Sequence, residues 1–180
     1  MSAASSAVDP LSPLCLSCGM CCDGTLHLRA ALDADERDRY AGSGFEYVEL
    51  ENRLYFDQPC RQLCGTACSI YAARPKVCRR YRCEIVRDVE TGDMSIGDAI
   101  GHVETARALC ATAETTMPGV GMSRTRGLAR AECANQLDHG DGGERAAAAA
   151  RLLPMIALDE YLARWFRVKK DQAPASEERA

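Results

Sequence analysis

Four cysteine thiols stand within eight residues near the start of the chain, in the run Cys15-x-x-Cys18-x-x-Cys21-Cys22. A spacer of two residues lets neighbouring thiolates reach one metal ion, and Gly19 allows the backbone to turn tightly between them. The triple C-x-x-C-x-x-C spacing is that of bacterial ferredoxins, but the x-x-x-C-P that completes their motif is missing. The run therefore predicts a thiolate metal site that differs from the ferredoxin motif.

A second thiol-rich segment supplies five more cysteines: Cys60, Cys64, Cys68, Cys78 and Cys83. Its C-x3-C-x3-C spacing differs from the C-x3-C-x2-C of radical enzymes that cleave S-adenosylmethionine, which argues against that class. The two remaining cysteines, Cys110 and Cys133, lie in segments with helical apolar spacing, where a cysteine is expected to act as a small buried hydrophobic residue. The nine clustered cysteines are therefore the predicted ligands.

The adjacent pair Cys21-Cys22 bears on the number of metal centres. In extended backbone, neighbouring side chains point to opposite sides, so the two sulfurs would serve different centres, or one would lie outside the ligand set. In helical backbone, Cys18 would share a face with both. We favour two neighbouring centres.

Several cations and one histidine lie near the thiols. Lys76, Arg79, Arg80 and Arg82 surround the last cysteines of the second segment. They would either lower the thiol pKa values and offset the charge of a thiolate centre, or form an ordinary solvated face. His27 is more often a packing residue than an extra ligand in such a context.

Composition limits the class of protein. The chain has 180 residues, which suits one domain, and its net charge of -4 argues against a nucleic-acid surface. It contains no apolar run long enough for a membrane span, and its first residues lack the pattern of a secretory signal. We therefore expect a cytoplasmic protein, in which thiols stay reduced. Eleven cysteines, an odd number, also do not suit a pure disulfide framework. The expected partner is metal, with a protein partner left open and neither nucleic acid nor membrane.

The elements predicted between the cysteine segments are short. The alternating residues 25–28 suggest a strand, Asp33 can cap a short helix that Gly42 and Gly44 would end, and two alternating runs around Glu51-Asn52 predict a hairpin. Beyond residue 83 the pattern becomes helical. It predicts a helix over 84–90 ended by Gly92, a helix capped by Ser95, a break at 117–119, a helix from Ser123 to about 137, and a helix from 144 interrupted at Pro154.

The expected fold class is mainly α, with a small irregular α+β half nucleated by metal. The predicted organisation is a disordered leader over 1–13, a cysteine-cluster module over 14–90, a helical region over 91–170 packed on it, and a disordered tail over 171–180.

The combined pattern resembles the CxxCxxCC cysteine-cluster family, also called the YkgJ-type family, a zinc- or iron-chelating domain. The resemblance rests on the double cysteine, the box Cys68-Ser-Ile-Tyr71 and the box Arg74-Pro75-x-x-Cys78-Arg79, in that order over roughly residues 14–90. It implies seven ligands, with Cys83 as a frequent eighth: Cys15, Cys18, Cys21, Cys22, Cys60, Cys68 and Cys78. Cys64 departs from the pattern and is either a ninth ligand or a bystander.

These observations favour a small metal-binding protein that holds iron–sulfur clusters or zinc. The triple spacing and the lack of a convincing histidine ligand favour iron–sulfur. One alternative is a metal-dependent protein-modifying or maturation enzyme, because flagellin lysine methylases also look like this family. This chain shows no G-x-G-type nucleotide loop, Ser-His-Asp set, HExxH or P-loop, so an enzymatic role would rest on the metal alone. Another alternative is a carrier of a soft metal such as Cu(I).

Overall fold

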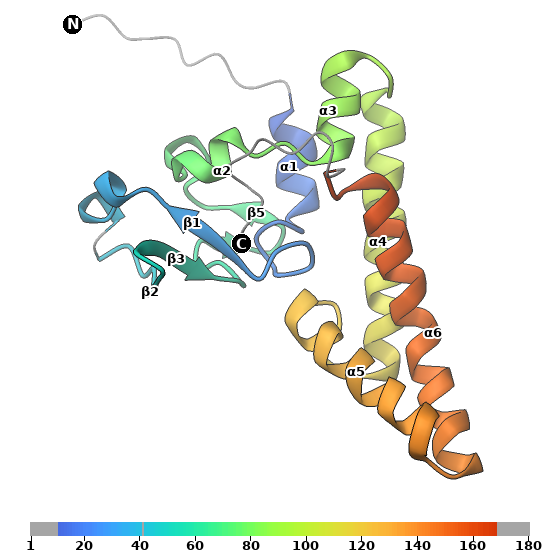
Figure 1. Cartoon of the computed structure of the whole chain (residues 1–180). Helices are drawn as coiled ribbons and strands as arrows, with labels where there is room; N and C mark the ends of the chain where they lie inside the picture. The colour runs from blue at the N-terminus through green and yellow to red at the C-terminus, as the bar shows by residue number, and fades with distance from the viewer. Residues whose placement is uncertain (1–10, 41, 169–180) are drawn as a thin grey trace, which may run out of the picture.

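The computed structural model describes residues 11–40 and 42–168, and the chain is mostly helical with small antiparallel sheets in its N-terminal half (Figure 1). This confirms the expected fold class. Of the predicted leader, residues 1–10 lie outside the described residues, whereas Leu11 and Ser12 are buried at the start of helix α1, Ser12–Cys18. The predicted tail over 171–180 also lies outside the described residues.

A three-stranded antiparallel sheet forms one side of the molecule, with strand order β1-β3-β2. The strands are β1, Arg29–Leu32, β2, Tyr47–Leu50, and β3, Arg53–Asp57. The hairpin predicted between β2 and β3 is confirmed, because Glu51 and Asn52 both have positive φ, as a tight two-residue turn requires. A second hairpin pairs β4, Leu63–Cys64, with β5, Ala67–Cys68.

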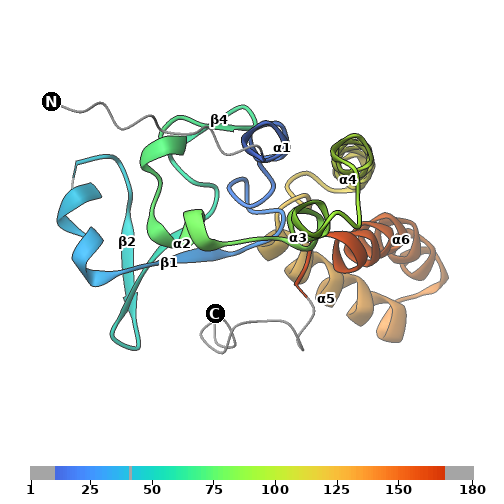
Figure 2. The ribbon, with the colours of Figure 1, turned by 90° about the horizontal axis from the view of Figure 1, so that it is seen from above.

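Helices build the other side of the molecule. They are α3, Glu84–Thr91, α4, Ile96–Thr116, α5, Ser123–His139, and α6, Gly142–Trp165, while the short α2, Lys76–Arg80, lies near the sheet. The hydroxyl of Ser95 accepts a hydrogen bond from the backbone N–H of Asp98, which confirms the predicted cap of α4. Figure 2 shows α1 and α3 between the strands and the long helices.

Three local predictions were wrong. The predicted strand over 25–28 lies a few residues later, as β1, because residues 29–32 are the ones that pair with β3. The helix predicted from Asp33 is instead two short 3-10 segments, Ala34–Glu36 and Asp38–Tyr40. Helix α6 runs through Pro154 without ending, because its buried residues on both sides of the proline, including Ala148 and Leu158, keep it packed in the core.

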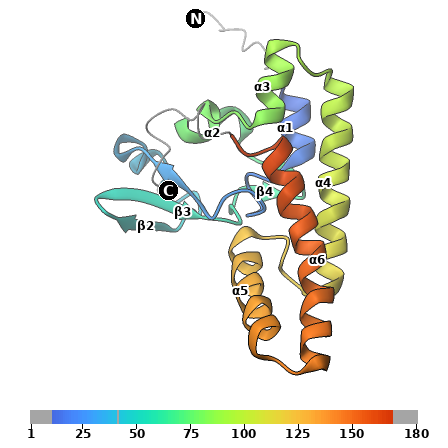
Figure 3. The same cartoon turned by 45° about the vertical axis from the view of Figure 1, so that its right-hand side comes forward.

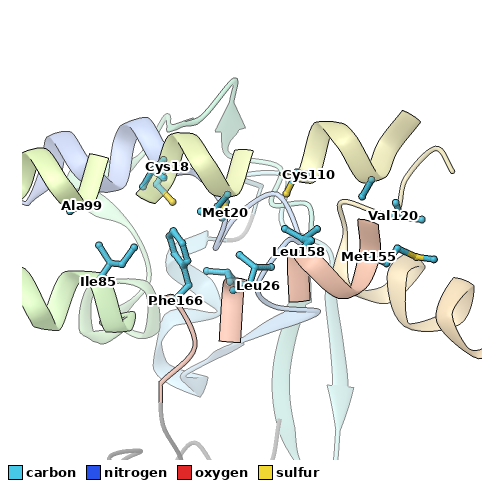
Figure 4. Packing of buried hydrophobic residues seen from close by; sticks show 14 of the residues in the cluster. Cys18, Met20, Leu26, Ile85, Ala99, Cys110, Val120, Met155, Leu158 and Phe166 are labelled. Atoms are coloured by element: carbon cyan, nitrogen blue, oxygen red, sulfur yellow. The ribbon is translucent and has the colours of Figure 1, made fainter. Parts of the chain in front are cut away.

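Two hydrophobic clusters hold these elements together. The larger one joins residues of the cysteine region, such as Met20 and Ile85, to residues of α4 and α6, such as Ala99 and Leu158 (Figure 4). The backbone N–H of Glu84, at the start of α3, also donates a 3.2 Å hydrogen bond to the carbonyl of Phe166, just beyond α6. The smaller cluster consists of Leu32, Tyr40, Leu54 and Phe56 beneath the sheet. No helix in the described ranges has both the length and the apolar character that crossing a bilayer needs.

Candidate metal centre

Helix α1 presents the first two cysteines. Cys15 and Cys18 are three residues apart and so lie on one face of the helix. The helix ends at Gly19, whose φ of 65° is left-handed, and a Cβ atom there would stand 2.7 Å from the carbonyl oxygen of Thr66. The chain then turns sharply, and the N–H of Cys22 donates to the carbonyl of Gly19 at 2.8 Å. Glycine is therefore required at position 19, in the turn that leads from α1 to the double cysteine.

The second cysteine segment meets the first through the backbone. The N–H of Cys60 donates a 2.7 Å hydrogen bond to the carbonyl of Cys22. Cys68 ends β5, Cys78 lies in α2, and Cys83 stands immediately before α3. The two thiol-rich segments, distant in sequence, are thus brought together in one region.

Four of the thiols pack together against the larger hydrophobic cluster: Cys15, Cys18, Cys21 and Cys83, which we call the first thiol group. The pKa of Cys18 is raised to about 12, mainly by burial and in smaller part by the nearby Cys83 and Cys15. Burial also places the pKa of Cys21 well above its usual range, with contributions from Cys83, Cys18, the adjacent Cys22 and Cys15. The pKa of Cys83 is raised to about 11 by burial, although the approach of the backbone amide of Val86 opposes this.

Four other thiols form the second thiol group, on the sheet side: Cys22, Cys60, Cys68 and Cys78. Cys60 and Cys78 pack against the smaller cluster. The pKa of Cys22 is raised to about 12, mainly by burial and in smaller part by its three partners in the group. Burial also raises the pKa of Cys78 to about 12, again with contributions from Cys60 and Cys68.

The adjacent residues Cys21 and Cys22 therefore belong to different groups. Cys64, the ninth predicted ligand, is exposed on β4. The eleven cysteines, all within the described residues, form no disulfide. As their side chains stand, no three histidine, cysteine or acidic residues of 11–40 and 42–168 are arranged to hold a metal ion. The thiols of each group are close enough to raise one another's pKa, but they do not form a closed ligand shell.

The comparisons place this cysteine region in a known family. The sequence model of the CxxCxxCC family, described as "Putative zinc- or iron-chelating domain", matches residues 14–111, more than half of the chain. The chain belongs to the CxxCxxCC family. No curated protein and no solved structure was found to match it significantly. The matched range runs beyond the cysteine segments into α4, so the CxxCxxCC domain includes part of the helical side.

Arg107 of α4, inside this matched range, fastens the end of α1 and the loop with the double cysteine to α4. Its guanidinium donates to the carbonyl of Cys18 and, at 2.7 Å, to the carboxylate of Asp23. Its positive charge also lowers the pKa of Cys18, against the larger effect of burial. Sequence patterns did not single out Arg107, because its role depends on how α4 packs against α1.

Helix α5 holds the same loop at two further points. The N–H of Ser123 donates to the carbonyl of Gly24 at 2.7 Å. Arg126, whose side chain is only 1% exposed, donates to the carbonyl of Thr25 at 3.1 Å. The loop that carries the double cysteine is therefore fixed by residues that lie more than eighty positions further along the chain.

The basic residues around Cys78 mostly bind other partners. Lys76 and Arg80 pair with Asp33 or Asp35, and Arg82 pairs with Glu90. Arg79 donates to the carbonyl of Arg74. Arg74 lies over the ring of Tyr71, and its charge lowers the pKa of Cys78, although burial dominates. Arg74 thus fits the interpretation that a cation offsets the charge of the thiolates. The other four basic residues contribute mainly to local structure: Lys76, Arg79, Arg80 and Arg82.

The remaining candidates stand apart from the thiol groups. His27 packs edge-on against Tyr81, with ring centroids 4.7 Å apart, and burial lowers its pKa. Cys110 and Cys133 are buried in the larger hydrophobic cluster, as their helical spacing predicted. Neither cysteine is a member of the two groups.

Proposed function

We propose that the CxxCxxCC domain holds two four-thiolate metal centres, and that these are iron–sulfur clusters. The first thiol group would hold one centre and the second thiol group the other. The observation that carries the proposal is that six of the eight thiols pack against two different hydrophobic clusters, Cys15, Cys18, Cys21 and Cys83 against the larger and Cys60 and Cys78 against the smaller. Cys22 and Cys68 join the second group through electrostatics, because Cys60, Cys78 and Cys68 all raise the pKa of Cys22. Two groups of four are the ligand number that either iron–sulfur clusters or structural zinc requires.

The surroundings of the thiols support binding of a cation. Eight thiols crowd together, and burial together with mutual repulsion raises the pKa of Cys18, Cys22 and Cys78 to about 12. A bound metal would supply the positive charge that these thiolates lack. Binding would draw the four thiols of each group onto the metal, so the stability of this half of the molecule would depend on the metal.

The composition of the ligand set supports a structural or electron-transfer role. Four thiolates for each centre fill the coordination positions, whereas catalysis at a metal needs a vacant position for substrate. This supports a metal-holding protein over a methylase-like enzyme or a carrier. The triple C-x-x-C-x-x-C spacing and the all-thiolate ligands support iron–sulfur over zinc. A reduced compartment, the cytoplasm, suits eleven cysteines without a disulfide.

The test is purification of the full chain under anaerobic conditions, followed by a visible spectrum and assays of iron, zinc and acid-labile sulfide. We expect a brown protein with a broad visible absorption band, and with iron and sulfide in similar amounts. A colourless protein with about two zinc ions per chain and no sulfide would rule out iron–sulfur clusters. The proposal of two four-thiolate sites would still stand. A protein that binds neither metal after reconstitution would overturn both.

The raised thiol pKa values predict that metal loading is coupled to proton release. The pKa of Cys18, Cys22 and Cys78 is raised to about 12 and that of Cys83 to about 11, so these thiols are protonated at pH 7 and loading is expected to release their protons. Without metal, the folded chain should lose stability as the pH rises from about 9 towards 12, because the pKa of Cys18, Cys22 and Cys78 is raised and the unfolded thiols ionise first. Calorimetric titration in buffers of different ionisation enthalpy measures the protons. Thermal unfolding across this pH range measures the stability, and an apo protein equally stable at pH 8 and pH 11 would contradict the expectation.

A further inference from the structure

A pocket of about 330 Å³ lies beside the start of α5, and no cysteine is among the residues that line it. Figure 3 shows α5 running alongside α6, and Arg126 near the start of α5 donates to Asp159 in the later part of α6. The pocket is lined by residues of both helices and by one residue beyond α6: Ser123, Arg126, Gly127, Arg130, Asp159 and Arg167. Three of these six residues are arginines and only one is acidic.

The positive charges exceed the negative charge that faces them. Asp159 accepts hydrogen bonds from Arg126 at 2.9 Å, from Arg167 at 3.2 Å and from Arg130. Burial alone would raise the pKa of Asp159, but the neighbouring guanidinium of Arg126 lowers it overall, so the carboxylate is ionised. Three guanidinium groups around one carboxylate leave two positive charges in excess.

The arginines differ in how far their donors are used. Arg126 is buried and is engaged by three backbone carbonyls in addition to Asp159. Arg130 and Arg167 have side chains that are 45% and 43% exposed, and within the described residues the side chain of each donates only to Asp159. Since a guanidinium carries five N–H donors, both retain donors for a ligand.

Two further features of the pocket suit an anion. The hydroxyl of Ser123 is buried and has no hydrogen-bond partner within the described ranges. A Cβ atom on Gly127 would meet nothing within 4 Å, so the wall there is open. The pocket also lies at the positive end of the dipole of α5, a helix of 17 residues preceded by Met122, which has no polar side chain to cap it.

We propose that this pocket binds a phosphate group, either as inorganic phosphate or as part of a small phosphate monoester. Guanidinium groups match the geometry of phosphate oxygens, and the hydroxyl of Ser123 supplies an additional donor. The volume is at the lower end of that of small-molecule sites, which suits phosphate with a small substituent. The proposal does not depend on the metal centres.

The test is calorimetric titration of the full chain with inorganic phosphate and, separately, with glycerol phosphate. We expect binding, weakened about tenfold or more by either Arg130→Gln or Arg167→Gln, because each removes a charged hydrogen bond. Arg164→Gln is the matched control, since Arg164 is an exposed arginine of α6 outside the pocket, and it should leave binding unchanged. Tighter binding of one compound identifies the source of the phosphate.

Asp159→Asn provides a test with the opposite sign. It removes the carboxylate that competes for Arg130 and Arg167, so phosphate should bind several-fold more tightly to this variant and should raise its melting temperature more than that of the parent chain. If the cluster were only a structural ion-pair network, the variant would be less stable and phosphate would not restore it. The proposal is overturned if the parent chain binds neither compound at millimolar concentration, or if the two glutamine variants bind as tightly as the Arg164→Gln control. Both arginines are exposed, so these variants should fold even if Asp159→Asn does not.

Discussion

Replacing Cys21 by serine is expected to remove about half of the bound metal, and replacing Cys22 by serine is expected to remove the other half. The two residues are neighbours in sequence, but Cys21 belongs to the first thiol group and Cys22 to the second. Loss of one thiolate from a set of four would empty that centre and leave the other one filled. Elemental analysis of the purified variants, normalised to protein concentration, measures the loss.

Double variants sharpen this expectation. Cys21→Ser combined with Cys83→Ser alters one group twice, so it should lose no more metal than Cys21→Ser alone. Cys21→Ser combined with Cys78→Ser alters both groups and should lose nearly all of the metal. The proposed division of the eight thiols would be contradicted if the metal losses of the single variants added up in both double variants. It would also be contradicted if they added up in neither.

Matched controls come from the two cysteines in the core. Cys110→Ser and Cys133→Ser place the same change in the larger hydrophobic cluster, outside both thiol groups, and should retain the full metal content. If either control lost metal while its stability was unchanged, the replaced cysteine would have to be counted among the metal ligands, and the ligand set would include the helical half. Cys64→Ser is also expected to retain the metal, because that thiol is exposed on β4.

Replacing Arg126 by methionine is expected to lower the free energy of unfolding by about 3–5 kcal/mol. Arg126 is almost fully buried and donates to the carbonyls of Thr25, Val120 and Gly121 as well as to Asp159. Methionine fills a similar volume but leaves these buried acceptors without a donor, and each unpaired group has a desolvation cost. Urea denaturation followed by circular dichroism measures the change.

The control for this variant is Arg124→Met, which makes the same change two residues earlier in α5. Arg124 is exposed and, among the residues that the structure describes, pairs with Asp57 at 3.6 Å, so its loss should cost less than about 1 kcal/mol. Equal destabilisation by the two variants would mean that the buried hydrogen bonds of Arg126 contribute little.

Features that depend on neighbouring residues could be predicted from the sequence. The hairpin at Glu51 and Asn52 and the cap at Ser95 follow from local turn and capping preferences, and both were confirmed. The clustered cysteines identified the family because their spacing is itself the signal. Cys110 and Cys133 were assigned to the core from helical periodicity alone.

Features that depend on packing could not be predicted in the same way. Arg107 and Arg126 resemble any other arginine of an amphipathic helix, and their roles appear only when α4 and α5 contact the loop after α1. The position of β1 was missed because pairing with β3, not local alternation, decides which residues form the strand. Pro154 was expected to interrupt a helix, but tertiary contacts on both sides of it outweigh one lost hydrogen bond.

The contact between Glu84 and Phe166 bears on the order in which the thiols of the two proposed centres come together during synthesis of the chain. Every thiol of the second group is present once the ribosome has passed Cys78. The first group includes Cys83, whose neighbour Glu84 is held by Phe166, and Phe166 is itself buried in the cluster that surrounds Cys18. At ordinary rates of translation, the interval between these two points is on the order of ten seconds. The four thiols proposed for the sheet-side centre are therefore all synthesised well before Phe166, although the loop that carries Cys22 is itself fixed only after α4 and α5 have been made.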